Sequence, residues 1–241
     1  MKILRGAEPT RLDALVDAAF AFAITLLVLW NDRLPNDFES LVAIFGLIPS
    51  FAASFALISF FWWQQVRWSR NHRVEDNLST VLSLALVFVV LIFVFPLRIM
   101  SSTFLSWITA GFLPTPFEGD LDGRVLCVLF LTYGLAFASM SACVFGLYRH
   151  SRSVRMRGAA PADDSVVDAA VGASVALVFT VVGLLSAALA GAFLLAGVTN
   201  VWVLTIAGWV YFLLLLTGVV GAQVRRRGAT RGETQEKPTR A

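Results

Sequence analysis

Asp17 stands at the edge of an apolar stretch, where a carboxylate needs a chemical explanation. It follows Arg11 and Asp13, and residues 18–30 after it carry no charge. An ionisable group in a membrane helix indicates function by default, and a ring of Asp17 carboxylates from several copies would concentrate cations at the mouth of a path. Alternatively, Asp17 is a structural acid that hydrogen-bonds to neighbouring helices. The sequence leaves both interpretations open.

The residues that follow this acid form a stripe along one side of a helix. At about 100° per residue, positions spaced by four, three and four residues fall on one line. Rings of apolar side chains can gate a water-filled path by dewetting. If copies of the chain assemble around this helix, its candidate pore-lining residues are Ala18, Phe22, Thr25 and Leu29, with Leu26 beside them.

The charges of this first helix need partners from elsewhere in the chain. Arg11 and Asp17 are six residues apart, or about 240° around a helix, so they cannot pair with each other. The second apolar segment ends in FFWWQQVRW, which supplies Gln64, Gln65 and Arg67 at the same membrane face. We therefore expect a polar network that joins the cytoplasmic ends of the first three membrane helices and anchors the first.

The start of the first helix has its own signal. Thr10 and Asp13 have the spacing of a capping box, in which each side chain bonds to the backbone of the other residue. We expect the helix to begin near Thr10, with Asp17 about two turns inside it.

The composition is that of a membrane protein. Of 241 residues, 58% are hydrophobic and 15% are charged, and the mean hydropathy is +0.76; soluble domains are about 45–50% apolar. Six segments approach the ~20 residues that span a bilayer: 14–30, 41–63, 78–97, 125–147, 169–196 and 201–224. The sequence thus predicts an all-α integral membrane protein, with a six-helix domain over 1–224 and a basic, disordered tail over 225–241.

Basic residues are distributed unevenly between the predicted loops. Of the 19 in the chain, all but Arg33, Arg98 and Arg124 lie in the N-terminal segment, the second-to-third loop, the fourth-to-fifth loop or the tail. By the positive-inside rule, both termini are cytoplasmic, which agrees with an even number of spans. The net charge of +3 follows from this distribution and gives no reason to expect nucleic-acid binding.

Motifs of enzymes and metal sites are absent from the sequence. There is no G-x-x-x-x-G-K-[ST] loop, no H-E-x-x-H and no paired-cysteine motif, and the only histidines, His72 and His150, lie in arginine-rich loops. The apolar segments hold almost no ionisable groups, which disfavours proton-coupled transport. We therefore expect no enzyme activity, no cofactor and no metal.

The first helix resembles the signature of the lysosomal potassium-channel family named for transmembrane protein 175, especially its single-repeat prokaryotic members. That signature reads Arg-x-x-x-Phe-Ser-Asp, followed by an apolar helix of the kind FAIAITLLVL. Here Arg11, Asp17 and residues 20–29 (FAFAITLLVL) match, whereas Leu15 and Val16 replace the family's Phe and Ser.

The resemblance continues into the second and third helices. The family's second helix tends to end in an aromatic-Trp-x-Asn-His-His-Arg pattern, of which Trp62 and Arg67 are kept and the two histidines are missing. The resemblance covers roughly residues 9–97.

This resemblance implies a homotetramer of six-helix subunits, in which the first helix of each lines a central, potassium-preferring pore without a carbonyl filter. It implies a constriction at Phe22 and Leu29, with the hydroxyl of Thr25 between them. Since the family has Leu or Ile in place of Phe22, the narrowest ring would be aromatic. The implied partners are potassium or other monovalent cations, the lipid bilayer and further copies of the chain.

Three functions fit the sequence. The leading hypothesis is a passive cation channel, selective for potassium. A small-solute carrier is the second, with Pro49 and the glycines of the fifth segment as mild pointers, and a non-conducting membrane scaffold is the third. Arginine outnumbers lysine 17 to 2, which is typical of a GC-rich bacterial genome and favours the bacterial plasma (inner) membrane.

Overall fold

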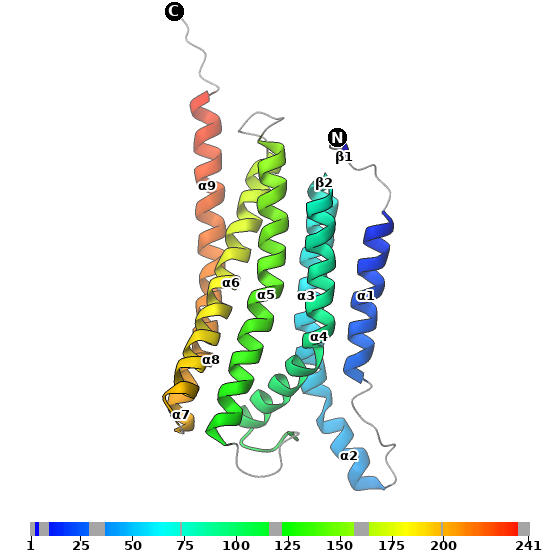
Figure 1. The fold of residues 1–241 in the computed structure, drawn as a ribbon, viewed down its shortest axis with the longest axis vertical. Coiled ribbons are helices and arrows are strands. Elements are labelled where there is room, and N and C mark those ends of the chain that lie inside the picture. Colours follow the sequence, from blue (N-terminus) through cyan, green and yellow to red (C-terminus); the bar gives the residue numbers. More distant parts are fainter. Residues whose placement is uncertain are drawn as a thin grey trace, which may run out of the picture.

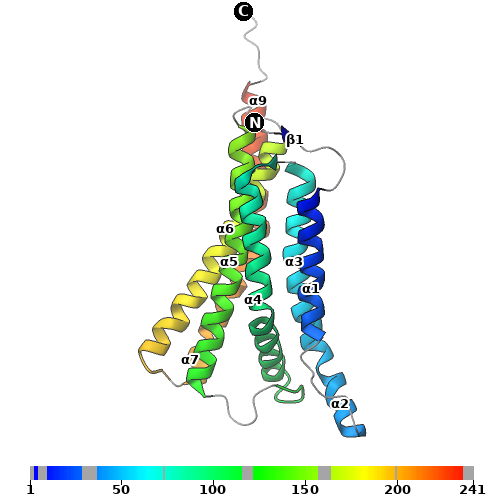
Figure 2. The ribbon, with the colours of Figure 1, turned by 45° about the vertical axis from the view of Figure 1, so that its right-hand side comes forward.

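The computed structural model describes residues 3–4, 10–28, 37–72, 74–115, 122–156, 164–198 and 200–235. These residues form a bundle of long helices that run side by side (Figure 1). Apart from a two-residue antiparallel pairing of β1 (Ile3–Leu4) with β2 (Val74–Glu75), the fold is helical. α1 begins and α9 ends at the same end of the bundle (Figures 1 and 2).

Six helical segments run along the bundle, as the hydropathy pattern predicts. The first five are α1 (Arg11–Val28), α3 (Ile48–His72), α4 (Asn77–Ile108), α5 (Gly123–Arg155) and α6 (Asp164–Leu195). The sixth is broken into α7 (Val201–Leu204), α8 (Ile206–Trp209), the 3-10 helix η1 (Val210–Leu216) and α9 (Thr217–Gln235). In the part of the chain that the structure describes, five of the six are long and apolar enough to cross a membrane, and α1, with three charges in 18 residues, falls short of that criterion.

The second segment differs from its prediction at both ends. It opens with a separate short helix, α2 (Phe38–Gly46), and α3 continues to His72 instead of ending at 63. Pro49 explains the break, because proline has no amide to bond to residue 45 and its ring clashes with that carbonyl in a continuous helix. In the first turn of α3 the same proline costs nothing.

The third segment is longer than predicted. α4 passes through Pro96 and ends at Ile108. Arg98 therefore lies inside this helix, which corrects its predicted place in an outer loop. Pro96 has no amide to bond to the carbonyl of Ile92, four residues earlier, yet the helix continues. After the proline, Ser101 Oγ donates to Leu97 O (2.9 Å) and Ser102 Oγ donates to Ile99 O (2.9 Å), so both hydroxyls find acceptors within α4.

The sixth segment is irregular where threonines interrupt it. Thr205 Oγ1 donates to Trp202 O (2.7 Å) and Thr217 Oγ1 donates to Leu214 O (2.6 Å), which are bonds to carbonyls three residues earlier. α9 then continues as a helix to Gln235, past residue 224, where the predicted sixth segment ends.

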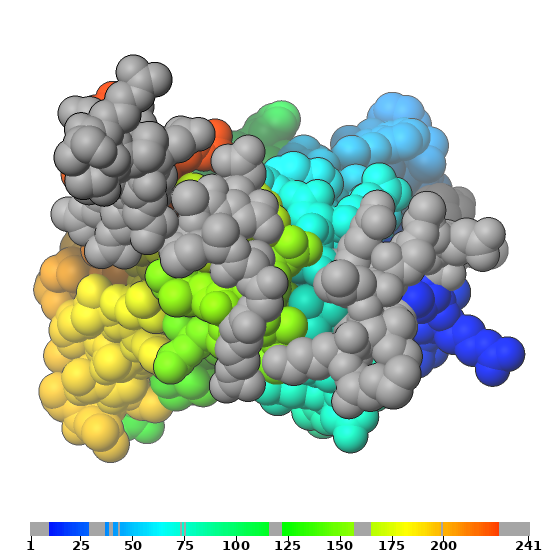
Figure 3. Space-filling model, turned by 90° about the horizontal axis from the view of Figure 1, so that it is seen from above, coloured from blue at the N-terminus to red at the C-terminus, as the bar shows by residue number. Residues whose placement is uncertain are grey.

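α5 and α6 pack closely through small residues. A Cβ added at Gly183 would lie 2.8 Å from the backbone nitrogen of Ala138, and one at Gly134 would lie 2.8 Å from that of Ala187. Small residues let membrane helices approach to this distance. α1, in contrast, lies at one edge of the bundle, as the view from above shows (Figure 3).

The candidate pore helix and its polar anchors

α1 has one buried face, which packs against α3 and α4. Val16, Phe20, Ala23 and Leu27 are each no more than 2% exposed. Their spacing of four, three and four residues places them on one side of the helix. Within the described chain, α1 therefore packs against its neighbours through this side only.

The predicted stripe lies on the opposite side of α1. Ala18, Phe22 and Thr25 are exposed, with Phe22 at 55%, and Leu26 at the border is half-buried. Leu29 lies outside the described residues. The Thr25 hydroxyl donates to Ala21 O (2.8 Å), so its hydrogen is used within the helix and its lone pairs stay free. No described part of the chain covers this face.

The predicted capping box is confirmed at the start of α1. Thr10 N donates to Asp13 Oδ2 (3.0 Å), and Asp13 N donates to Thr10 Oγ1 (3.3 Å). Each bond satisfies an amide that has no partner within the helix. The helix accordingly begins at Arg11.

Two carboxylates tie α1 to α3. The indole Nε1 of Trp62 donates to Asp17 Oδ1 (2.8 Å), and Ser69 Oγ donates to Asp13 Oδ1 (2.7 Å). Sequence reasoning offered Gln64, Gln65 and Arg67 as partners and missed Trp62 as a donor. The available signal was its indole N–H, which needs an acceptor when it leaves water.

Gln65 and Arg67 of α3 bond to helices other than α1. Gln64 and Gln65 are buried, and Gln65 Nε2 donates to Ser83 Oγ on α4 (3.0 Å). Arg67 Nη2 donates to Asp168 Oδ1 on α6 (2.9 Å), which joins α3 to a helix that the predicted network did not include. Arg11 is exposed at the start of α1.

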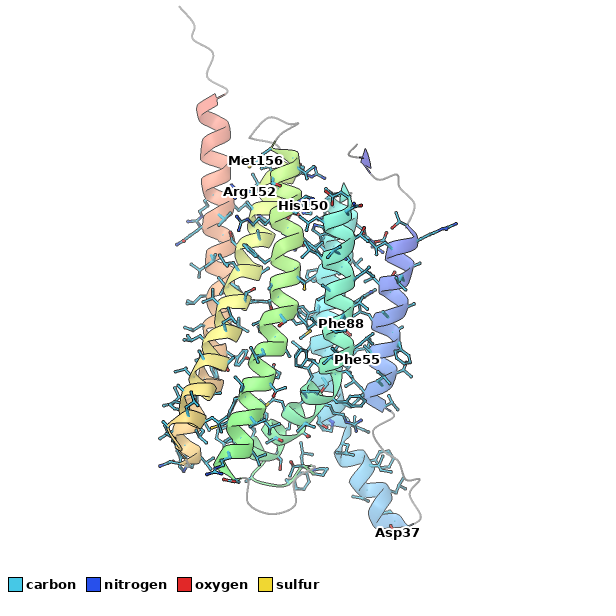
Figure 4. The ribbon with its side chains drawn as sticks, in the orientation of Figure 1. Asp37, Phe55, Phe88, His150, Arg152 and Met156 are labelled. Atoms are coloured by element: carbon cyan, nitrogen blue, oxygen red, sulfur yellow. The ribbon has the colours of Figure 1, made fainter. Side chains whose placement is uncertain are left out.

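α5 also meets this end of α3. Trp68 Nε1 donates to Ser151 Oγ (2.8 Å), and Arg155 Nη2 donates to the carbonyls of Asn71 and His72 (2.9 Å each). α3 therefore contacts α1, α4, α5 and α6 through polar groups at one end of the bundle. His150 and Arg152 of α5 lie at this end in Figure 4, whereas Asp37 lies at the other.

Asp76 closes the same end as the N-cap of α4. It accepts bonds from Ser79 N (2.9 Å) and from the ring of His150. Burial alone would raise the pKa of the Asp76 carboxyl, but these hydrogen bonds outweigh it and hold the pKa below its ordinary value. Asp76 is thus a charged anchor between α4 and α5.

The described residues contain no group of three or more His, Cys, Asp or Glu side chains that could hold a metal ion. Cys127 and Cys143 are free thiols.

Comparison with known proteins identifies relatives by sequence. The sequence profile of the family described as endosomal/lysosomal potassium channel TMEM175 matches residues 11–96. A protein of Marivirga tractuosa named "Potassium channel" is 36% identical over 140 residues, which cover 56% of this chain and 56% of the relative. The match thus spans little more than half of the length of that relative.

A solved structure extends the likeness over nearly the whole chain. It is a crystal structure of a variant of the potassium channel MtTMEM175 in complex with a Nanobody-MBP fusion protein. Its TM-score is 0.76 and its identity is 26%, over 93% of this chain and 97% of that chain. The sequence match over residues 11–96 and the fold match over 93% of the chain make this protein similar to the TMEM175 potassium channels in both sequence and fold.

Proposed function

We propose that this protein is a potassium channel in which α1 from each of four copies lines a central pore. The single observation that carries the proposal is the exposed face of α1, which includes Phe22 at 55% exposure. A helix at the edge of the bundle with one packed and one open face is suited to pack around an axis with copies of itself. Both relatives described above are named potassium channels, which supports potassium as the permeant ion.

The chemistry of the exposed face suits a passing cation. Asp17 at one end attracts cations, and from Ala18 to Val28 no fixed charge would hold them. Because the hydrogen of the Thr25 hydroxyl points to Ala21 O, its oxygen lone pairs are available to replace water around a partly dehydrated ion. Phe22 would form an apolar ring between these two points, where the path can dewet and close.

The orientation follows from charge. α1 begins and α9 ends at one end of the bundle, and the same end carries the arginines of α3 and the last turn of α5 (Figure 4). By the positive-inside rule this end, with both termini, faces the cytoplasm of a bacterial plasma membrane. Asp17, two turns inside α1, then lies at the cytoplasmic mouth.

The test is potassium flux from liposomes that contain the purified protein. Phe22→Ala widens the apolar ring and raises the flux several-fold, whereas Phe212→Ala, an equally exposed aromatic in the broken sixth segment, leaves it unchanged. Flux no higher than that of empty vesicles, with tetramers confirmed by cross-linking, refutes the channel. Equal flux in both variants shows that Phe22 does not line the constriction.

A small-solute carrier is the second candidate, favoured by the broken sixth segment. Broken membrane helices in carriers place backbone groups around a substrate. Saturable, substrate-specific uptake in the same liposomes would establish this function in place of the channel. Assembly without any transport would establish a scaffold.

A further inference from the structure

Arg98 is a buried arginine on α4, far from the basic end of the bundle. Its side chain is 7% exposed, and its Nη1 donates to the carbonyl oxygen of Leu27, in the last turn of α1. Within the part of the chain that the structure describes, this carbonyl is the polar partner of Arg98 and no carboxylate pairs with it. A buried cation without an acidic partner is costly, so its position needs a reason.

The end of α1 supplies that reason. The last four carbonyls of a helix have no amide partner within the helix and carry the negative end of its dipole. Arg98 satisfies one of these carbonyls with a charged donor. Its positive charge also offsets the negative end of the α1 dipole. Arg98 therefore caps α1 from a neighbouring helix.

The shape of α4 allows this contact. Arg98 lies two residues after Pro96, and α4 changes direction in its second half (Figures 1 and 2). Beyond this point α4 is bonded to α3, since Ser54 Oγ donates to Ser101 Oγ (3.0 Å) in a partly buried contact. Arg98 thus extends from the part of α4 that is bonded to α3 to the last turn of α1.

We propose that Arg98 is a positioning residue for ion selectivity, and this rests on the proposed channel function. By holding the Leu27 carbonyl, Arg98 fixes the last turn of α1. Thr25 lies two residues earlier on the opposite, pore-facing side, so any movement of that turn moves the Thr25 oxygen. Without Arg98 the turn loosens, the Thr25 ring widens and the preference for potassium over sodium falls.

The experiment compares three variants with the wild type. Arg98→Met keeps the length of the side chain and removes its charge, and Arg98→Lys keeps the charge with a single donor group. Arg124→Met is the matched control, because Arg124 is an exposed arginine at the same end of the bundle. The permeability ratio of potassium to sodium is taken from reversal potentials of the full-length protein in planar bilayers.

We expect Arg98→Met to lower this ratio at least about threefold, a change of the size that residues away from a site impose on it. Arg98→Lys restores part of the loss, and Arg124→Met matches the wild type. A second readout is hydrogen exchange of the amides of residues 21–28, which becomes about tenfold faster in Arg98→Met when the charged hydrogen bond is lost.

Each outcome decides one claim. An unchanged permeability ratio in assembled Arg98→Met overturns the role in selectivity, and unchanged exchange overturns the hold on α1. If the wild type carries no current, the channel function fails, and the exchange measurement still decides whether Arg98 holds α1. If Arg98→Met does not assemble, Arg98→Lys carries both tests, with smaller shifts in the same direction expected.

Discussion

The close contact between α5 and α6 gives a prediction whose size can be worked out from the structure. Gly183→Ala puts a methyl group 2.8 Å from the backbone nitrogen of Ala138, and 3.0 Å from its Cα and Cβ. These atoms belong to a helix backbone and cannot rotate away, so α5 and α6 must separate. Overpacking of this kind costs about 1–3 kcal/mol.

Gly191 on the same helix is the matched control. A Cβ there would meet no atom nearer than Leu131 Cδ1, at 3.8 Å, which is an ordinary contact. Replacing glycine by alanine inside a helix gains about 1 kcal/mol from backbone entropy in either variant. In Gly191→Ala this gain is the whole effect, whereas in Gly183→Ala the cost of overpacking opposes it. The two variants should therefore differ by about 1–3 kcal/mol in unfolding free energy.

The assay is thermal unfolding of the purified protein in detergent, followed by tryptophan fluorescence. For a protein of this size, 1 kcal/mol corresponds to about 2–4 °C in Tm. Gly183→Ala should therefore melt about 2–12 °C below Gly191→Ala. Equal melting temperatures would refute the reasoning, because they would mean that α5 and α6 do not approach each other at Gly183.

Three further predictions concern the polar end of the bundle. Ser151→Ala leaves the buried indole N–H of Trp68 unpaired and should lower the unfolding free energy by about 1–3 kcal/mol, measured by thermal melting. Trp62→Phe removes the donor to Asp17; since Asp17 is exposed and water can replace the indole, the loss in the same assay should be smaller, about 1 kcal/mol, and a loss larger than that of Ser151→Ala would contradict this account. Because the pKa of Asp76 is held below its ordinary 3.8, the stabilisation by its charge is present above that pH and disappears as the pH falls through the lowered pKa. Asp76→Asn should remove this part of the acid sensitivity in melting curves recorded across that range, and an unchanged pH dependence would argue against it.

Features that depend on nearby residues could be predicted from the sequence. The capping box of Thr10 and Asp13 involves residues three apart, and the structure has both of its bonds. The six apolar segments were visible because each has to satisfy its own backbone within lipid. The stripe with Phe22 at its centre follows from helical periodicity, and the structure leaves it exposed.

Features that depend on which helix faces meet could not be predicted. Trp62 lies 45 residues from its acceptor Asp17 in the sequence, and Asp168 lies 101 residues from its donor Arg67. Several polar side chains near the membrane edge could have served equally well. Arg98 was misplaced for a different reason, because the predicted third segment ended at residue 97, whereas α4 continues to Ile108.

The three charges of α1 have a consequence for how the protein is made. Arg11, Asp13 and Asp17 lie within the first seven positions of an 18-residue helix, and each charge disfavours insertion into the bilayer. The side chains that donate hydrogen bonds to the two acids, Trp62 and Ser69, belong to α3 and leave the ribosome later. We therefore expect stable insertion of α1 to depend on α3, and to be completed only after α3 has been synthesised.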